Sequence, residues 1–98
     1  MTGLNFYLIS YDIRDESRWR SVHNIMKEFG TRLHYSVFRC DLNRQGRIEL
    51  IALLSERIKH DEDRIMIVNL GPLKDNAMDR ITFIGERPPE DLGRQIIV

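Results

Sequence analysis

Strand-forming residues run almost without interruption from Phe6 to Ile13, in the sequence FYLISYDI. Aromatic and branched aliphatic side chains favour the pleated, buried environment of a central strand, and only the small hydroxyl of Ser10 interrupts the large side chains. The run carries a carboxylate, Asp12, at its exit. The pattern therefore predicts a central first strand with an acidic residue at its end.

The apolar positions then change to helical spacing. Apolar side chains recur at steps of three and four residues, at Trp19, Val22, Ile25, Met26 and Phe29. Asp15 precedes them with a side chain suited to an N-cap, and Gly30 follows them, where we expect it to close the helix with a left-handed turn. The pattern predicts a helix from Glu16 to Phe29.

Residues 31–42 mix β-branched and aromatic side chains in rough alternation, which predicts extended structure. This segment is long for a single strand. We therefore expect a kink or a tight hairpin near Tyr35 and Ser36.

A second helix is predicted after Asn43, whose side chain can cap it. Its apolar positions are Ile48, Ile51, Ala52, Leu54 and Ile58, with Leu50 and Leu53 widening the apolar arc. A helix so broadly apolar must cover a sheet or meet another subunit, because leaving each Leu in water would forfeit about 1.5 to 3 kcal/mol of burial. The acidic residues that follow, Asp61, Glu62 and Asp63, are expected to form a solvated loop.

The remaining chain contains shorter strand-like segments. Residues 64–70 predict a third strand, which a Gly-Pro pair ends. Residues 73–79 read as a mobile connection and residues 81–85 as another short strand. The apolar end at 95–98 is either frayed or docked on a sheet edge, and that edge could belong to a partner.

The order of these elements predicts the fold class. A strand, a helix, an extended region, a helix and a strand favour an α+β two-layer sandwich, with an antiparallel sheet and both helices on one face, which is the ferredoxin-like arrangement. We expect residues 1–98 to form a single domain in which residues 71–98 are a looser C-terminal extension. This topology places the end of the first strand and the start of the first helix on the same rim.

Composition narrows the classes of function. The 98 residues include 15 basic and 15 acidic side chains, so net charge gives no support for blanket attraction to nucleic acid or to a membrane. Cys40 is the single cysteine, which excludes an internal disulfide and favours a reduced, cytoplasmic protein. No apolar run approaches the ~20 residues that a membrane helix needs.

Candidate chemistry gathers on the predicted rim. Asp12 lies there with Arg14, Arg18 and Arg20, and a hard divalent cation normally wants more oxygen ligands than one carboxylate. Two protomers paired about a two-fold axis would bring two Asp12 side chains together. The alternative is that Asp12 and Asp15 make local turn bonds while the arginines form exposed ion pairs worth ~0 to 1 kcal/mol, and spacing alone favours this alternative.

Other candidates carry weaker signals. None of the histidines has a His, Cys or carboxylate partner at a metal-ligand spacing. Phe38 beside Arg39 could be a base-stacking platform with a phosphate contact, although an aromatic residue on a strand more often belongs to the core.

The combination of motifs resembles the CRISPR-associated protein two family. The similarity is carried by YLISYDI at 7–13, by a helix that ends at Gly30 and by RLHYSVF at 32–38. It continues through CDL at 40–42 and the strand at 63–70, so it covers about the first seventy residues.

The resemblance implies a ferredoxin-like homodimer in which the end of one protomer extends the sheet of the other, giving residues 81–85 and 95–98 a partner. It implies that the two Asp12 carboxylates share a Mg²⁺ or Mn²⁺ ion, and that Asp12 is the catalytic residue of a metal-dependent endonuclease acting on RNA or DNA. Arg18, Arg20, Arg32 and Phe38 match positions that the family uses on nucleic acid, whereas His34 replaces a frequent Gln.

The same resemblance implies a second role, as the non-catalytic centre of the complex with the CRISPR integrase, CRISPR-associated protein one, that captures spacer DNA. We take the DNA-binding scaffold as the biological role, with endonuclease activity as an intrinsic property. The alternative is a toxin-like endoribonuclease of related fold. A metabolite-binding module is disfavoured because the first strand is not followed by a glycine-rich turn.

Overall fold

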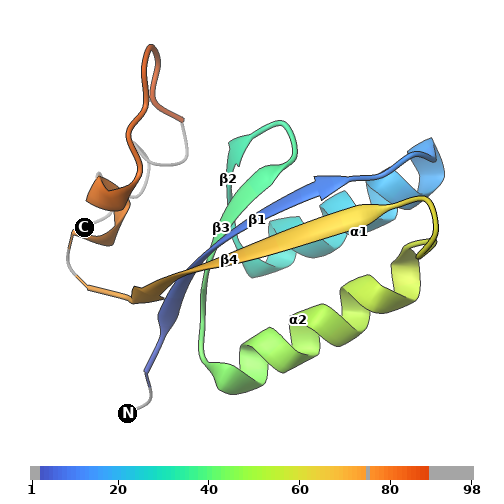
Figure 1. The fold of residues 1–98 in the computed structure, drawn as a ribbon, viewed down its shortest axis with the longest axis horizontal. Coiled ribbons are helices and arrows are strands. Elements are labelled where there is room, and N and C mark those ends of the chain that lie inside the picture. The colour runs from blue at the N-terminus through green and yellow to red at the C-terminus, as the bar shows by residue number, and fades with distance from the viewer. Residues whose placement is uncertain (1–2, 75, 89–98) are drawn as a thin grey trace.

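The computed structural model describes residues 3–74 and 76–88, and its strands form one antiparallel sheet (Figure 1). The elements are β1 (Asn5–Asp12), α1 (Glu16–Phe29), β2 (Thr31–His34), β3 (Val37–Leu42), α2 (Arg44–Arg57), β4 (Arg64–Pro72) and the 3₁₀ helix η1 (Ala77–Arg80). The four strands lie in the order β2-β3-β1-β4. The predicted α+β, ferredoxin-like architecture is confirmed.

The core lies between one face of this sheet and both helices. Side chains alternate along a strand, so Tyr7, Ile9 and Tyr11 of β1 point to the same face. All three are buried in a single cluster with residues of β3 (Phe38, Cys40, Leu42), α1 (Val22, Met26) and α2 (Leu50, Leu54). Both helices therefore cover the face that these residues define.

Helix α1 begins and ends where the sequence predicts. The Asp15 side chain caps it by accepting a hydrogen bond of 2.9 Å from the Arg18 amide. The predicted left-handed turn at Gly30 is wrong, because this residue has an extended backbone with φ −156°. Glycine is needed there for space, since a Cβ would lie 2.2 Å from the Arg39 carbonyl oxygen and 2.5 Å from the Cys40 sulfur.

The predicted break in the second extended region is confirmed. β2 ends at His34 and β3 begins at Val37, so Tyr35 and Ser36 form the turn of a hairpin. The Ser36 carbonyl accepts a 3.1 Å hydrogen bond from the Tyr11 amide. This bond attaches the turn to the end of β1.

Helix α2 has the predicted cap but a narrower buried face. The Asn43 side chain accepts a 2.7 Å hydrogen bond from the Gly46 amide. Ile48, which we expected on the apolar face, is 51% exposed and does not face the sheet. Leu50 and Leu54 lie one turn apart on the buried side, and a position two residues from Leu50 is rotated about 200° away from it. Among the described residues, no helix is long and apolar enough to cross a membrane.

The other face of the sheet carries Phe6, Leu8, Ser10 and Asp12 from β1, because these alternate with the core positions. Phe6 is fully buried there beneath the Arg39 guanidinium, which lies 4.7 Å from the centre of its ring. Arg39 is in turn paired with Asp41 at 2.7 Å. This face therefore has a small packed region of its own at the Phe6 end and polar groups at the Asp12 end.

The segment after β4 leaves the sheet and approaches β2 (Figure 1). The Phe83 ring lies 6.2 Å from that of His34, and η1 occupies part of the connection predicted at residues 73–79. The short strand predicted at 81–85 is absent from the structure of the single chain. The strand-like segment predicted at 95–98 lies outside the described residues.

Candidate functional site

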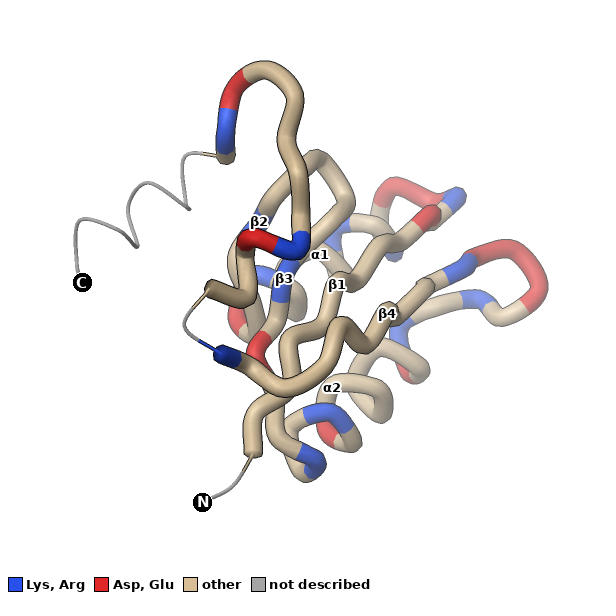
Figure 2. Tube along the Cα trace, turned by 60° about the vertical axis from the view of Figure 1, so that its left-hand side comes forward, with Lys and Arg blue, Asp and Glu red and all other residues tan. Residues whose placement is uncertain are grey.

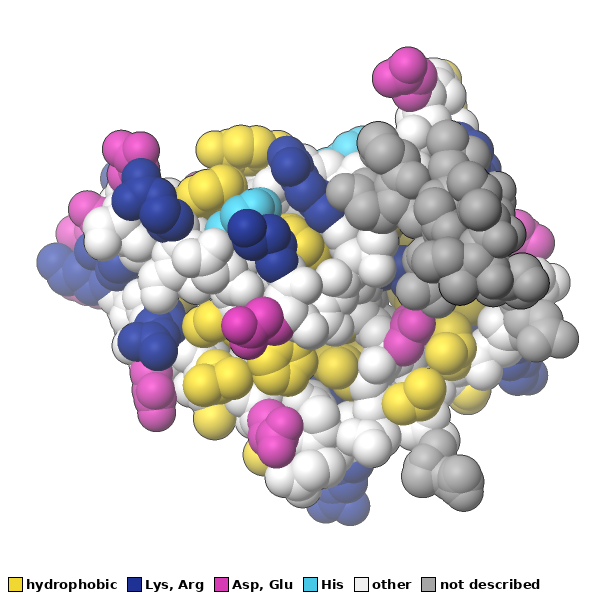
Figure 3. Space-filling view, turned by 180° about the vertical axis from the view of Figure 1, so that it is seen from behind, with side chains coloured by type: hydrophobic (Ala, Val, Ile, Leu, Met, Phe, Trp, Pro, Cys, Tyr) yellow, Lys and Arg dark blue, Asp and Glu magenta, His cyan; other side chains and the backbone are white. Residues whose placement is uncertain are grey.

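An open cleft of about 380 Å³ lies at the end of β1, between the start of α1 and the β2–β3 turn. Its lining residues are Tyr11, Asp12, Ile13, Arg14, Glu16, Trp19, Arg20, Tyr35 and Ser36. Figure 3 shows basic and acidic side chains at the edge where α1 begins, with hydrophobic side chains exposed near them. The structure thus brings three of the predicted site residues, Asp12, Arg14 and Arg20, into one cleft.

Asp12 is the one carboxylate that β1 contributes to this cleft. It is exposed and lies opposite Arg64 in the β1–β4 register. Within residues 3–74 and 76–88 its side chain forms no hydrogen bond or ion pair, so the predicted local turn bond is not made by Asp12. An exposed and unengaged carboxylate remains available to a ligand from outside the chain.

Asp12 is the cleft residue considered as a ligand for a divalent cation. In the part of the chain that the structure describes, no group of three or more His, Cys, Asp or Glu residues is placed to hold a metal ion. Mg²⁺ is usually bound through one or two carboxylates together with waters and substrate phosphates. A single Asp12 carboxylate would need further oxygen ligands, from waters, substrate phosphates or a second copy of the chain, to hold such an ion.

Arg14 and Arg20 supply the positive charge of the cleft. Arg20 forms an exposed ion pair with Glu16, one turn away on α1, at 3.1 Å. Exposed pairs of this spacing stabilise helices by about 0.3 to 0.5 kcal/mol. Arg20 can therefore exchange Glu16 for a phosphate at little cost.

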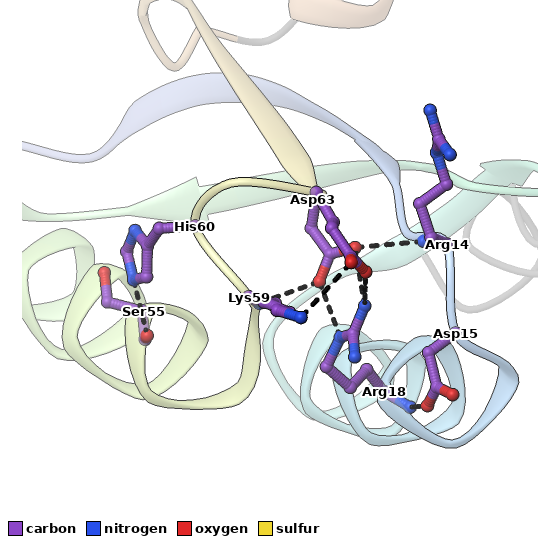
Figure 4. Close-up of polar contacts among 8 residues, drawn as sticks. Arg14, Asp15, Arg18, Ser55, Lys59, His60 and Asp63 are labelled. Carbon is purple, nitrogen blue, oxygen red and sulfur yellow. Dashed lines mark hydrogen bonds and ion pairs between the residues drawn. The ribbon is translucent and has the colours of Figure 1, made fainter.

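Arg18 points away from the cleft, in contrast to its predicted role on nucleic acid. Its Nε lies 2.8 Å from Asp63 Oδ2, and one of its terminal nitrogens lies 3.0 Å from Glu62 Oε1 (Figure 4). These ion pairs connect α1 to the loop before β4, which Figure 2 shows beside the charged start of α1. The guanidinium is thus occupied by the fold.

Asp63 is a structural residue that sequence reasoning missed. We expected a solvated side chain, whereas its side chain is 0% exposed and accepts four hydrogen bonds, two from Arg18 and one each from the amides of Arg14 and Lys59. The Arg18 side-chain hydrogen bond, followed by those backbone amides, holds the pKa of the Asp63 carboxyl well below its usual range. No local signal separates Asp63 from its exposed neighbours Asp61 and Glu62, because its partners lie elsewhere in the chain.

Arg32 lies on the short strand β2, next to the cleft but outside its lining. Its Nε donates a 3.1 Å hydrogen bond to the His34 carbonyl, and its guanidinium lies 5.8 Å from the centre of the Tyr35 ring. Both contacts are exposed, so Arg32 can contribute charge beside the cleft.

The base-stacking role considered for Phe38 does not hold in this structure. Phe38 is 1% exposed and its ring stacks at 6.2 Å on that of Tyr11. The Tyr11 hydroxyl lies 2.6 Å from His23 Nδ1, and burial raises the pKa of Tyr11 to about 12. Burial also lowers the pKa of His23, which favours the neutral imidazole beside this hydroxyl. Phe38 supports these residues from the core.

Comparison with known proteins identifies the family. The model of the family described as CRISPR associated protein Cas2 matches residues 5–78. The chain is a member of the Cas2 family. The matched residues run from the start of β1 into η1, so they include every residue that lines the cleft.

Two relatives show how far the similarity extends. A protein of Geobacter sulfurreducens named "CRISPR-associated endoribonuclease Cas2" is 37% identical over 94 residues, which cover 96% of this chain and 98% of the relative. A protein of Rhodospirillum rubrum named "CRISPR-associated endoribonuclease Cas2 1" is 38% identical over 69 residues, covering 70% and 68% of the two chains. The resemblance to this family that the sequence motifs indicate is therefore confirmed.

Solved structures agree on the fold. Cas2 of Streptococcus pyogenes, crystallised at pH 6.5, has a TM-score of 0.69 at 25% identity and covers 82% of this chain and 99% of its own. A hypothetical protein of Thermus thermophilus has a TM-score of 0.73 at 26% identity and covers 88% and 96% of the two chains.

Proposed function

We propose that this Cas2-family protein is a homodimer that binds nucleic acid, acts as a DNA-binding scaffold with the CRISPR integrase in spacer acquisition, and has an intrinsic endonuclease activity dependent on Mg²⁺ or Mn²⁺. The observation that carries this proposal is the cleft at the end of β1, where an unengaged carboxylate, Asp12, lies with Arg14 and Arg20. Family membership favours this role over a toxin-like endoribonuclease.

The face of the sheet opposite the helices supports a homodimer. Ile65 and Ile67 of β4 pack against the core, so Met66 and Val68 point to the other face with Leu8 of β1. Met66 is 55% exposed there. A second copy placed on this face would cover these apolar side chains, and a two-fold axis near the strand end would bring together two copies of Asp12, which lies on the same face.

The chemistry follows from that pairing. Two Asp12 carboxylates would hold one divalent ion, which would supply Lewis acidity toward a phosphodiester and activate water for its hydrolysis. Arg14 and Arg20 hold the phosphate by charge-assisted hydrogen bonds and keep the backbone in the cleft. Two relatives whose names call them endoribonucleases support RNA as a substrate.

The endonuclease activity is tested with Asp12→Asn. This change removes a metal ligand from an exposed position, so we expect loss of Mg²⁺-dependent cleavage of RNA and DNA with no change in the thermal midpoint or in the mass of the dimer. Asp61→Asn is the matched control, because Asp61 is an exposed acidic residue outside the cleft. Undiminished cleavage by the purified Asp12 variant would show that the activity does not come from this site.

The scaffold role is tested separately through the arginines. A double change of Arg14 and Arg20 to Glu should weaken binding to duplex DNA and reduce its dependence on salt, because each phosphate contact releases counterions. Arg44 and Arg57 are exposed on α2 and provide a control with the same change of charge. Arg18 is unsuitable for this test, because replacing it would leave the buried Asp63 carboxylate without its ion-pair partner.

The integrase partnership has its own readout. In a spacer-integration assay with the integrase, Asp12→Asn should remain active, whereas the double Arg14 and Arg20 variant should be impaired. Loss of integration in the Asp12 variant with an intact dimer would make the carboxylate essential to the scaffold as well. Equal integration by the double variant would contradict the proposed DNA contacts.

A further inference from the structure

Arg64 lies directly across from Asp12 on the neighbouring strand. The two residues are Cα partners in the antiparallel pairing of β1 with β4, and both are exposed. Residues in such a pair have Cβ atoms about 4.5 to 5.5 Å apart and point to the same face of the sheet. A guanidinium and a carboxylate therefore lie side by side on the face opposite the helices.

In the described part of the chain, no competing partner for Arg64 lies next to it. The next pair in register on the same face is Ser10 with Met66, and neither is charged. Among residues 3–74 and 76–88, the Arg64 side chain forms no hydrogen bond or ion pair. Asp63, the carboxylate that precedes it in the sequence, is already bound by Arg18 and by two backbone amides. The charge of Arg64 is thus left to act on Asp12.

The proposed homodimer gives this pair of charges a function. A two-fold axis near the strand end brings two Asp12 carboxylates together. Like charges that face each other across an interface repel and weaken association. A shared divalent ion would cancel the repulsion, whereas a scaffold that does not depend on the ion needs positive charge from the chain itself.

We infer that Arg64 is the counter-ion of Asp12 that allows two copies of the chain to associate when no metal ion is bound. The inference rests on the proposed homodimer and adds a positioning residue to it, because Arg64 acts through Asp12. Two-fold symmetry places one Arg64 beside each Asp12, so two positive charges balance two negative ones. Opposite charges across a strand pair attract each other, and the attraction is stronger where a partner surface excludes water.

Arg64 suits this role better than the arginines of the cleft. Arg14 and Arg20 line the cleft, where the proposed function assigns them to phosphate, and Arg20 is also paired with Glu16. Arg64 lies outside that lining, and it is the first residue of β4, whose register with β1 holds it beside Asp12. Its charge therefore stays at Asp12 whether or not nucleic acid occupies the cleft.

The test measures the mass of the protein, which does not depend on cleavage activity. Light scattering coupled to size-exclusion chromatography gives the mass of the full-length chain without nucleic acid, over a range of protein concentrations, in EDTA and in Mg²⁺. The variants are Arg64→Gln, Asp12→Asn and the double variant with both changes. Arg57→Gln is the matched control, because Arg57 is an exposed arginine of α2, on the other side of the sheet.

We expect the unchanged protein, Arg57→Gln and Asp12→Asn to be dimers in both solutions. Arg64→Gln should dissociate in EDTA, with a dimer dissociation constant raised on the order of tenfold or more, because two uncompensated carboxylates then face each other. Mg²⁺ should restore its dimer by supplying the missing positive charge. The double variant should be a dimer in EDTA, since Asp12→Asn removes the charge that Arg64 balances.

An Arg64→Gln variant that dimerises in EDTA as tightly as the unchanged protein would overturn the inference and leave the proposed homodimer standing. Dissociation that Asp12→Asn does not reverse would also overturn it, because Arg64 would then support the interface through a different contact. Reversal by Asp12→Asn but not by Mg²⁺ would support the counter-ion and count against the shared metal ion.

The unchanged protein provides the remaining outcomes. A dimer that forms only in Mg²⁺ would overturn the inference, since Arg64 would not suffice to balance Asp12. A monomer in both solutions would overturn the proposed homodimer and the inference with it. These outcomes distinguish failure of the counter-ion from failure of the wider proposal.

Discussion

Arg18 and Asp63 form the ion pair that ties the start of α1 to the start of β4, with 2.8 Å between Arg18 Nε and Asp63 Oδ2. The same carboxylate accepts a 3.0 Å hydrogen bond from the Arg14 amide. The connection after β1, which carries Arg14 into the cleft, is therefore held by a residue that does not itself line the cleft. Any ligand at this rim depends on that support for the position of its binding groups.

We predict that Asp63→Asn destabilises the protein by about 2 kcal/mol, because it removes the charge from a side chain that is 0% exposed and hydrogen-bonded to Arg18. The value should lie below the ~3 to 5 kcal/mol of a fully buried pair, since the Arg18 side chain is 26% exposed and water can solvate it. Urea denaturation measures the change. Asp61→Asn, at an exposed position two residues away, should change the stability by less than about 0.5 kcal/mol, and an equal loss in both variants would contradict the role assigned to Asp63.

The same carboxylate predicts how stability depends on pH. Its pKa in the folded protein is held below the value of about 3.9 for an unfolded Asp, so the unfolded chain takes up a proton first as the pH falls. The stabilisation from Asp63 should be complete above about pH 5 and should be lost as the pH falls through 4 toward the lower folded-state pKa. Urea denaturation between these pH values should show a flatter profile for Asp63→Asn than for Asp61→Asn, and parallel profiles would refute the assignment.

The contrast between α1 and Asp63 shows what local sequence can specify. The bounds of α1 were predictable because its N-cap, Asp15, and its apolar stripe lie within the helix sequence itself. The partner that buries Asp63 is Arg18, 45 positions away, and the adjacent Asp61 and Glu62 have the same local character but stay exposed. Burial of a charge depends on tertiary partners, which a local pattern does not contain.

The position of some cleft residues could likewise be predicted from the sequence, and that of other candidate residues could not. Asp12, Arg14 and Arg20 were predictable as neighbours because the strand-to-helix connection is short and the topology places them on one rim. The orientation of Arg18 was not, because two positions along a helix rotate a side chain by about 200°, which places Arg18 toward Asp63 and Arg20 toward the cleft. Phe38 lies in the core because its side chain points to the same face of the sheet as that of Cys40. Which face this is depends on the register of β3 with β1.

Gly30 provides a test of close packing between α1 and β3. A Cβ at this position would lie 2.2 Å from the Arg39 carbonyl oxygen, so backbone must move to accommodate it. We predict that Gly30→Ala costs about 1 to 3 kcal/mol, the usual range for overpacking. Gly3→Ala is the control, since a Cβ there meets nothing within 4 Å. Thermal and urea denaturation that gave the two variants equal stability would show that the hairpin shifts freely away from the helix.

The proposed dimer predicts that the sheet face opposite the helices is more sensitive to charge than the helix surface. Met66 and Ile48 are similarly exposed, at 55% and 51%, but only Met66 lies on the face shared with Asp12. Met66→Glu would place like charges against one another across the two-fold axis and next to the paired Asp12 carboxylates, so we expect it to convert the dimer to a monomer. Ile48→Glu should remain a dimer.

Light scattering coupled to size-exclusion chromatography gives the mass of each variant, and Mg²⁺-dependent cleavage should be lost with the dimer because a monomer offers a single carboxylate. A dimer that persists in Met66→Glu and dissociates in Ile48→Glu would move the interface to α2 and would leave the two Asp12 side chains too far apart to share an ion.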